Sequence, residues 1–508
     1  LTATVPTATV PDEPRKAEWV RGKAFRSLLA AGVSARHRYA ADKALALHEQ
    51  ALQYADGVGE RAEAIAATGD DHEIAFDGDL AVAAWQAAIT ALRTVRGHLD
   101  RRAELCLKAA QMVVIRWGGF RRPIDPTLGD RFIDEGLAIV SDASIRSQLL
   151  SLRALCGGRW AWTGRADPVA AAERHRAAQA ARALADRLDS AALRSLAQLG
   201  LASVYFLQRR YDDAVTAVLD EVALVEQGGR DRDRAMGHAI ACHVIGTVYA
   251  DYERALGHAR QSYALGHDLA PHDQLHGTYV MMTCLEQLGR WAEIPPYLAE
   301  HRRLRQGRET EMSCPYIRGG MLVGALALAR GGDPAAAREV ADQVVIDLDH
   351  PGNAEAMHGQ LAIELGDAEA GRALAERLVR LGRRPGPEEV PHENLVLVDA
   401  LRVTGDHAAL REFLPAARES AGFLAAITPT CDRAEGAAQA AAGDHARATA
   451  LLTRAIAGFD RLGLPLPAAR TREELARLTP GQAPALRQAA LHTYLRLGAT
   501  PDATRLRP

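Results

Sequence analysis

The chain has 508 residues, and its 61 basic and 64 acidic side chains give a formal net charge of -3 at pH 7. This balance excludes an overall electrostatic attraction to nucleic acid or to an anionic membrane. Apolar residues make up 48% and aromatic residues only 5%, which suits closely packed helices with small contact residues and disfavours β-strands. The composition predicts an all-α protein, and the length is too great for one ordinary core.

The first 14 residues contain two tandem copies of T-A-T-V-P, which predict a disordered Thr/Pro linker over 1–14. The chain begins with Leu1 rather than Met, and we interpret this as a sign that something precedes residue 1 or that the chain was cut there.

The N-terminus lacks a basic region followed by an apolar one, and the longest apolar run, 321–329, is far shorter than the roughly 20 residues of a membrane helix. Six cysteines without any C-x-x-C pair predict buried free thiols. We therefore expect a cytoplasmic protein without a membrane partner.

Helical hairpins can be followed along the chain from their turn residues. The first hairpin ends with 41–57, and later second helices are preceded by Gly78 with Asp79, by Arg209 with Arg210, and by Gly289 with Arg290; the segment 246–266 predicts a hairpin with a shortened turn. The segment 99–190 is the least regular. Its loops at 115–132 and 156–168 are interpreted as long turns within one continuous array, with a subdomain boundary as the alternative. A further joint is predicted at 381–393, which holds three prolines and two glycines.

A Gly-Asp pair followed by an alanine-rich helix recurs four times in the C-terminal half. The glycines are Gly332, Gly366, Gly405 and Gly443, at separations of 34, 39 and 38 residues. Glycine accepts the left-handed conformation that ends one helix, and the Asp carboxylate caps the next. A phosphate loop would need a lysine after the glycines and a strand before them, and both are missing at Gly331. The pairs therefore predict hairpin turns and no cofactor.

Small and aromatic residues in these hairpins follow the pattern of tetratricopeptide repeats. Ala202, Tyr205, Tyr211 and Ala214 match it in one unit, and Gly246, Tyr249 and Ala255 match it in the next. The chain thus resembles a tetratricopeptide solenoid. The resemblance implies a right-handed α-solenoid of about ten to twelve hairpins, with a superhelix over 15–380, the joint at 381–393, and C-terminal hairpins with capping helices over 394–508.

The C-terminal third, in particular 455–478 and 490–508, resembles the helical tails of large bacterial signal-transducing ATPases. The segment 314–341 resembles the same tails, which occur in cyclase-linked ATPases of this type and in large LuxR-type transcription regulators. This resemblance implies a sensor or interaction arm, with a neighbouring ATPase or effector domain upstream of residue 1 as one partner.

Six of the 18 histidines lie between residues 238 and 276, and His272 and His276 are one helical turn apart, as in zinc-binding helices. Asp273 occupies the position at which zinc proteases carry their general base, and the sequence assigns no third ligand. We interpret the pair as solvated or groove-lining, with metal binding as the alternative.

No nucleophile with its base is recognisable. The basic run 301–309 is interpreted as a solvated helix end, with contact to an acidic partner as the alternative. Its lack of interleaved aromatic residues disfavours nucleic acid as a partner.

The tetratricopeptide resemblance implies that the first helix of each hairpin lines a concave groove. Carried onto this chain, the groove positions are His243, Thr247, His276, Tyr279, Thr283, Glu286, Asn353, Gln360, Asp399 and Arg402. Their mixed polar chemistry suits a protein or peptide segment bound through hydrogen bonds. The resulting hypothesis is a non-catalytic binding scaffold or sensor region. The alternative is a helical-repeat enzyme or a metal-binding protein that uses the His-rich region 238–276.

Overall fold

A computed structural model describes residues 13–38, 40–95, 97–121, 125, 127–155, 168–306, 314–346, 353–382 and 392–507. In these residues every regular element is a helix and none is a strand. The predicted all-α array of helical hairpins is therefore confirmed. Among the same residues, no helix combines the length and the hydropathy that a bilayer-spanning segment requires.

The chain divides into two compact units between Leu152 and Arg153, inside the segment that was expected to be least regular. The helices of the first unit are α1 Glu13–Arg36, α2 Ala41–Tyr54, α3 Gly57–Ile74, α4 Gly78–Leu92, α5 Leu99–Val114, α6 Thr127–Ile139 and α7 Ala143–Leu155, the last of which runs across the division. A short 3-10 turn, Trp117–Gly119, follows α5.

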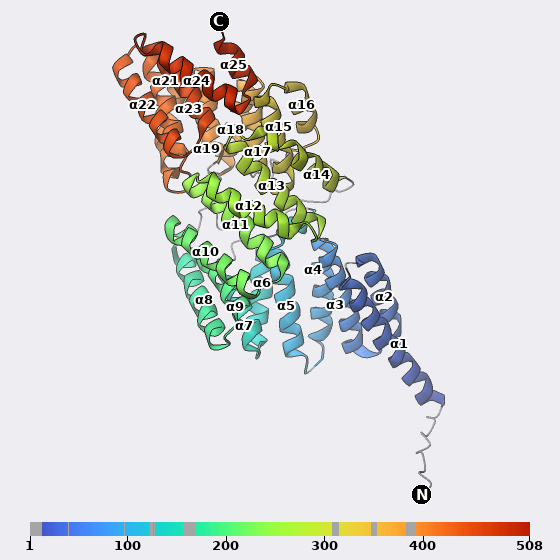
Figure 1. The fold of residues 1–508 in the computed structure, drawn as a ribbon. Coiled ribbons are helices and arrows are strands. Elements are labelled where there is room, and N and C mark those ends of the chain that lie inside the picture. Colours follow the sequence, from blue (N-terminus) through green and yellow to red (C-terminus); the bar gives the residue numbers. More distant parts are fainter. Residues whose placement is uncertain are drawn as a thin grey trace. The chain divides into compact units, whose positions relative to one another are not determined.

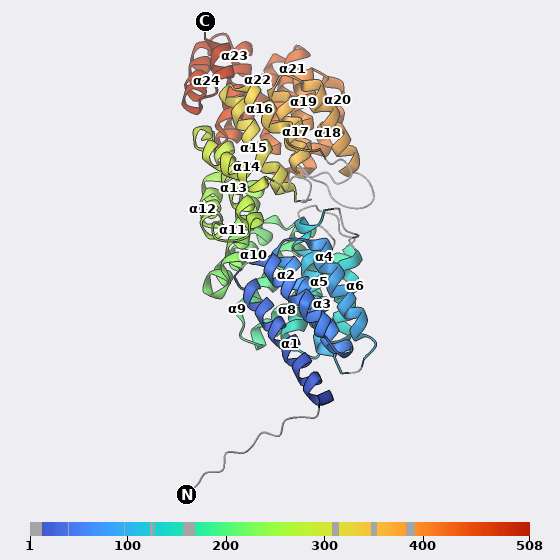
Figure 2. The ribbon, with the colours of Figure 1, turned by 90° about the vertical axis from the view of Figure 1, so that its right-hand side faces the viewer.

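The second unit holds the remaining helices, and consecutive helices pack against each other as hairpins (Figures 1 and 2). They are α8 Pro168–Arg187, α9 Ala191–Leu207, α10 Tyr211–Gly228, α11 Asp231–Tyr249, α12 Tyr252–Gly266, α13 Pro271–Gln287, α14 Pro295–Arg305, α15 Pro315–Gly331, α16 Pro334–Ala341, α17 Asn353–Glu364, α18 Ala368–Gly382, α19 His392–Thr404, α20 His407–Arg418, α21 Ile427–Ala441, α22 His445–Arg461, α23 Pro465–Leu478, α24 Ala483–Leu497 and α25 Thr500–Leu506. Short 3-10 turns lie at Trp291–Glu293 and Glu419–Gly422.

The four Gly-Asp pairs form the turns that the sequence predicts. Gly332, Gly366, Gly405 and Gly443 all have positive φ, between 73° and 101°. Each following Asp accepts a hydrogen bond from the backbone N–H three residues later, at 3.0 or 3.1 Å. Glycine ends one helix and aspartate caps the next, so these loops need no ligand to explain them.

The turn before α4 differs from the prediction. The helix already begins at Gly78, and its cap is Asp77, which accepts a hydrogen bond from the Leu80 N–H at 3.1 Å. Phe76 takes the left-handed conformation there, with φ of 62°. Buried Phe76 lies against Gly119, where a Cβ would come within 3.3 Å of its ring, so tertiary packing places a residue other than glycine in this turn.

Some predicted segments lie wholly or largely outside the described residues. These are the linker before Glu13, the loop 156–167 and most of the joint at 381–393. Helices from both sides of that joint, α17 and α19, pack against each other within the second unit.

The second unit closes on itself, because its late helices contact its early ones. Phe423, in the segment between α20 and α21, packs its ring against Phe206 and Tyr211 at centroid distances of 5.8 and 5.6 Å. Two residues later, the Ala425 N–H donates to the Thr247 carbonyl oxygen at 3.4 Å. The inner faces of the helices therefore surround an interior space.

Candidate functional site

The second unit contains a cavity of about 230 Å³ along the inner faces of its helices. The lining side chains come mainly from every second helix, namely α11, α13, α15, α17, α19, α21 and α23. Of the six helices that alternate with them, α14, α16, α18 and α20 contribute nothing to the lining, and α12 and α22 contribute one residue each, Tyr252 and Phe459. One helix of each hairpin therefore supplies the chemistry, and its partner packs outside it.

The structure brings seven of the ten expected groove residues to this cavity: His243, Thr247, Tyr279, Thr283, Glu286, Gln360 and Asp399. Arg402 lines an adjoining cavity of about 320 Å³, which also contains Asp399. The side chain of Asn353 lies outside the described part of the structure. His276 is buried behind the cavity wall rather than in the lining, next to His272 and Tyr316.

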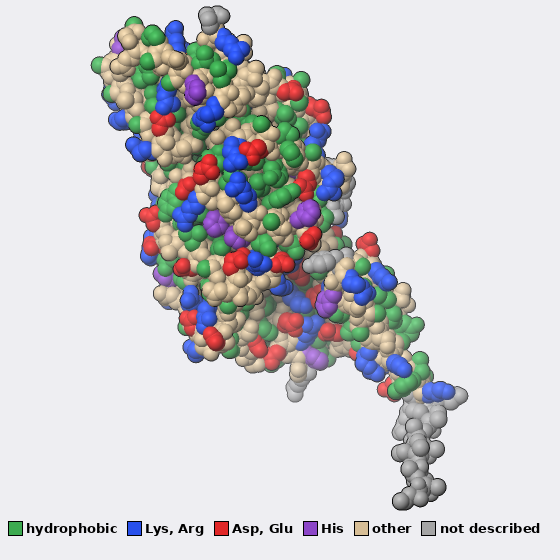
Figure 3. Space-filling view, viewed as in Figure 1, with side chains coloured by type: hydrophobic (Ala, Val, Ile, Leu, Met, Phe, Trp, Pro, Cys, Tyr) green, Lys and Arg blue, Asp and Glu red, His purple; other side chains and the backbone are tan. Residues whose placement is uncertain are grey.

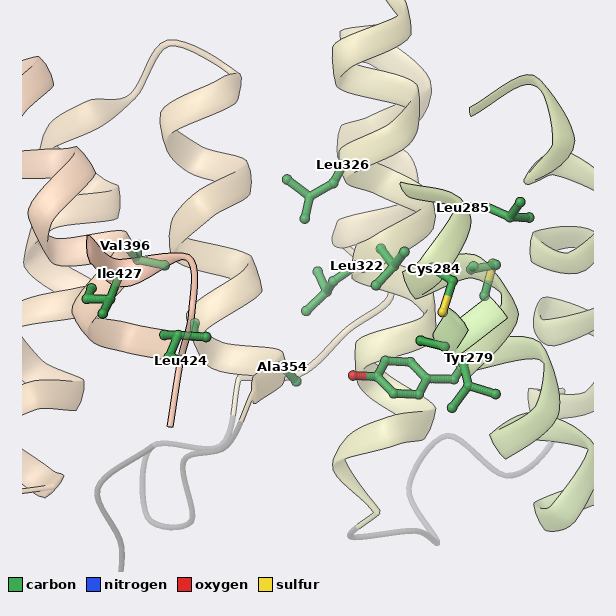
Figure 4. Packing of buried hydrophobic residues seen from close by; sticks show 14 of the residues in the cluster. Tyr279, Cys284, Leu285, Leu322, Leu326, Ala354, Val396, Leu424 and Ile427 are labelled. Carbon is green, nitrogen blue, oxygen red and sulfur yellow. The ribbon is translucent and has the colours of Figure 1, made fainter. Parts of the chain in front are cut away.

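One part of the wall is apolar. It is formed by Val280, Val323, Leu326, Met357, Leu395, Val396, Phe459, Leu464 and Leu466. Figure 4 shows the Leu326 side chain and the Tyr279 hydroxyl pointing toward the space that separates α13 and α15 from the helices carrying Val396 and Ile427. This part of the cavity suits an uncharged, partly apolar group.

The other end of the cavity is charged and internally paired. Glu364 of α17 accepts hydrogen bonds from Arg330 of α15 at 2.9 Å and from Arg470 of α23 at 2.8 Å. Arg330 also pairs with Glu286 of α13, and Arg470 pairs with Asp502 of α25 at 2.8 Å. These ion pairs join five helices, α13, α15, α17, α23 and α25, around one end of the cavity.

A second set of pairs lies beside the first. Arg402 contacts Asp399 at 2.7 Å and Glu474 at 2.9 Å, and Arg433 contacts Glu474 at 2.7 Å. The lining of the main cavity thus contains three carboxylates, Glu286, Glu364 and Asp399, and three guanidinium groups, Arg330, Arg433 and Arg470. Since the charges balance and are already paired, this end offers little net attraction to a charged ligand.

The charge states follow from this pairing. Burial raises the pKa of Glu364, but Arg470 and Arg330 outweigh burial and hold the pKa well below its ordinary value. Two histidines, His243 and His392, line the cavity. Burial lowers the pKa of each to about 4, and the charge of His392 adds to the shift at His243. At neutral pH the cavity therefore presents ionised pairs at one end and neutral imidazoles in its wall.

The histidines between 238 and 276 do not form one site. His238 and His258 contact each other through their Nδ1 atoms at 3.0 Å, and Glu226 lies 3.1 Å from His238 Nε2. His243 lines the cavity, whereas His267 is exposed. The alternative hypothesis of metal binding within 238–276 therefore concerns the pair His272 and His276, whose rings contact each other.

His272 and His276 are buried, so the interpretation as a solvated pair is wrong. Their rings lie on one face of α13 with centroids 4.3 Å apart. Cys314, directly before α15, places its Sγ 3.3 Å from His276 Nε2. The sequence carries no signal for this third residue, because it lies 38 positions away in another hairpin.

Other cavity residues also escaped sequence analysis. Arg330, Glu364, His392, Arg433 and Arg470 all line the cavity. A usable signal was present in part: Glu364 ends an inner helix directly before the turn at Gly366, and Arg330 holds the corresponding place before the turn at Gly332. The pairing partners of these residues could not be read from the sequence, because up to 106 positions separate them.

The surface of the protein does not single out another site on the face drawn in Figure 3. There, Lys and Arg side chains are interspersed with Asp and Glu side chains. This mixture agrees with the balanced net charge.

No protein-family model and no curated protein matches the chain. Among solved structures, the chain is similar to the APC/C hetero-tetramer Cut9-Hcn1 at 13% identity and a TM-score of 0.47, over 95% of this chain and 96% of that chain. A Rap protein complexed with Competence and Sporulation Factor is found at 13% identity and a TM-score of 0.42, covering 85% and 99%. A signal-transduction ATPase from Pyrococcus horikoshii is found at 11% identity and a TM-score of 0.41, covering 81% and 53%.

The last of these has a tetratricopeptide repeat sensor, the class of repeat that the sequence of this chain resembles. At such identities and TM-scores no conclusion about ligand or partner follows from the likeness.

Proposed function

We propose that this chain is a non-catalytic binding region whose second unit receives a peptide segment of a partner protein in the cavity lined by Tyr279, Leu326 and Gln360. The observation that carries the proposal is the lining itself: the inner helices of successive hairpins converge on one cavity whose wall is apolar and whose charges are internally paired. Repeat arrays commonly use such inner surfaces for extended partners.

The chemistry favours an uncharged segment with an apolar side chain. The three carboxylates and three guanidinium groups of the lining already neutralise one another, so a phosphate or a free carboxylate would have to break existing ion pairs. Gln360 carries a side-chain amide that matches peptide groups, and the Thr283 hydroxyl, which donates to the Tyr279 carbonyl oxygen at 2.9 Å, can still accept a hydrogen bond. A volume of about 230 Å³ accommodates one or two side chains rather than a whole folded partner.

We further propose that binding is passed to a neighbouring domain, as expected for the sensing arm of a bacterial, cytoplasmic signalling ATPase or transcription regulator. The support for this finer assignment is the sequence resemblance of 314–341, 455–478 and 490–508 to the tails of those regulators. Ion pairs join the helices α13, α15, α17, α23 and α25. A ligand that displaces one wall of the cavity would therefore also displace helices that lie far apart in the sequence.

A random peptide library selected on the purified chain, followed by calorimetry with individual peptides, tests the proposal. Selected peptides are expected to carry an apolar residue, and Gln360→Trp, which fills the cavity, is expected to weaken them by more than about ten-fold. The matched control is Gln488→Trp on the exposed face of α24, which should leave affinity unchanged.

Two results would contradict the proposal. One is the absence of any enriched peptide. The other is equal binding by both tryptophan variants, which would place the peptide outside the cavity. Binding of the fluorescent probe anilinonaphthalene sulfonate, abolished by Gln360→Trp and accompanied by no peptide binding, would instead identify a site for small molecules.

A further inference from the structure

Three metal-ligand side chains meet at the join between α13 and α15. His272, His276 and Cys314 each offer one ligand atom, and these atoms all lie within 4.8 Å of one another. Their side chains are 4%, 9% and 2% exposed. Among the residues that the structure describes, this is the one cluster of three such side chains with this spacing.

The geometry is close to that of a tetrahedral site. His272 and His276 are one turn apart on the same face of α13, so both imidazoles point the same way. With zinc–nitrogen bonds of about 2.1 Å and zinc–sulfur bonds of about 2.3 Å, tetrahedral nitrogen and sulfur ligands lie about 3.5 Å apart. The observed distance from His276 Nε2 to Cys314 Sγ is 3.3 Å, which is near this value, and the His272 ligand atom lies within 4.8 Å of both.

The surroundings of the three side chains keep water out and leave one proton to be displaced. Cys314 is the N-cap residue of α15, so its sulfur lies at the positive end of that helix, but burial raises the pKa of the thiol to about 12, and a metal ion would bind by displacing the thiol proton. Leu275, Leu304 and Ile317 pack around Cys314 and exclude water from its sulfur. Arg232, a nearby cation that would oppose a metal ion, is paired with Asp273 at 3.3 Å.

We propose that His272, His276 and Cys314 bind a Zn²⁺ ion, with a fourth position left for water or another donor. Two imidazoles and one thiolate suit this borderline-soft cation and exclude Mg²⁺ and Ca²⁺, which prefer oxygen ligands. The ion would fasten the start of α15 to α13. Tyr279, one turn beyond His276, lines the cavity, and Tyr316, two residues after Cys314, packs against it at 5.1 Å, so the ion would also fix one wall of that cavity.

Metal titration of the full chain tests this site independently of any peptide. After removal of metals with a chelator, Zn²⁺ should bind at one equivalent per chain and raise the temperature of unfolding. Co²⁺ should give a thiolate-to-cobalt charge-transfer band. Cys314→Ser should abolish the band and weaken Zn²⁺ binding by more than about 100-fold, since changes outside the ligand shell alone cost up to that factor.

Cys431→Ser is the matched control, because Cys431 is likewise a fully buried free thiol but lies in α21. It should keep both the band and the affinity. If metal-free Cys314→Ser does not unfold at the temperature of the metal-free wild type, His272→Gln replaces it and should weaken Zn²⁺ binding to the same degree. Zn²⁺ binding unchanged in both ligand variants, the lack of one-equivalent binding, or binding of Cu⁺ without Zn²⁺ would overturn the assignment.

Discussion

Arg470 of α23 donates to Glu364 of α17 at 2.8 Å, although 106 positions separate the two residues in the chain. The same Glu364 accepts a hydrogen bond from Arg330 at 2.9 Å, and the same Arg470 pairs with Asp502 at 2.8 Å. This ion pair spans the end of the cavity and connects hairpins that are not neighbours in sequence. Its energetic role can be measured directly.

Replacing Arg470 by Met should lower the free energy of unfolding by about 3 kcal/mol, because it leaves buried carboxylates short of a partner. The double variant Arg470→Met with Glu364→Gln should lose less than the sum of the two single changes, since both charges are then gone. Urea unfolding measures both values. The exposed pair Arg290 and Glu293, 2.6 Å apart, is the control, and Ala at either position should cost less than about 1 kcal/mol. Strict additivity at Arg470 and Glu364 would show that the pair does not couple its helices.

A comparison of alanine substitutions at Gly289 and Gly405 distinguishes the cost of backbone strain from the cost of a steric clash. Both have positive φ, 72° and 73°, so alanine costs about 1 kcal/mol or more of backbone strain at either position. A Cβ at Gly289 would lie 2.4 Å from Leu497 Cδ2 of α24, whereas a Cβ at Gly405 meets nothing within 4 Å. Gly289→Ala should therefore lower the thermal unfolding temperature more than Gly405→Ala. Equal shifts would mean that α24 does not approach the turn after α13 in solution.

Because of Glu221, the free energy of unfolding should fall as the pH rises. Burial raises its pKa to about 8, and although its Oε1 accepts a hydrogen bond from Ser195 at 3.1 Å, its Oε2 has no hydrogen-bond partner. Between about pH 4.5 and 8 the folded state holds a proton that the unfolded chain releases, so the free energy of unfolding should fall by up to about 1.4 kcal/mol per pH unit. Glu221→Gln should remove this contribution in urea unfolding series at several pH values. An unchanged pH profile in this variant would contradict the assignment.

The parts of the fold that could be predicted from sequence are those with local causes. Gly332 and Asp333 form a turn because of their own conformational and capping preferences. The tetratricopeptide resemblance implied groove positions for Thr283 and Gln360, and both line the cavity. Phe76 shows where local preference fails: nothing in its own chemistry predicts a left-handed turn, which is held by packing. Local preference also missed its neighbour Asp77 as the cap of α4.

The candidate sites were predicted in part for the same reason. The spacing of His272 and His276 predicts that both lie on one face of a helix. Their partner Cys314 belongs to another hairpin, and no local pattern indicates it. The burial of this pair also depends on α15, which supplies Cys314, Tyr316 and Ile317 around it. Contacts between hairpins of a degenerate repeat leave no fixed spacing in the sequence, so they become visible only in three dimensions.

The contact of Phe423 with Phe206 and Tyr211 has a consequence for how the second unit unfolds. In an open repeat array each unit touches only its neighbours, so stability is gained step by step and ends fray independently. Here the segment after α20 docks onto α9 and α10, so hairpins far apart in the sequence of the unit share one set of contacts. The unit should then melt as a single cooperative block, and its slow folding step should be the meeting of these two distant aromatic segments.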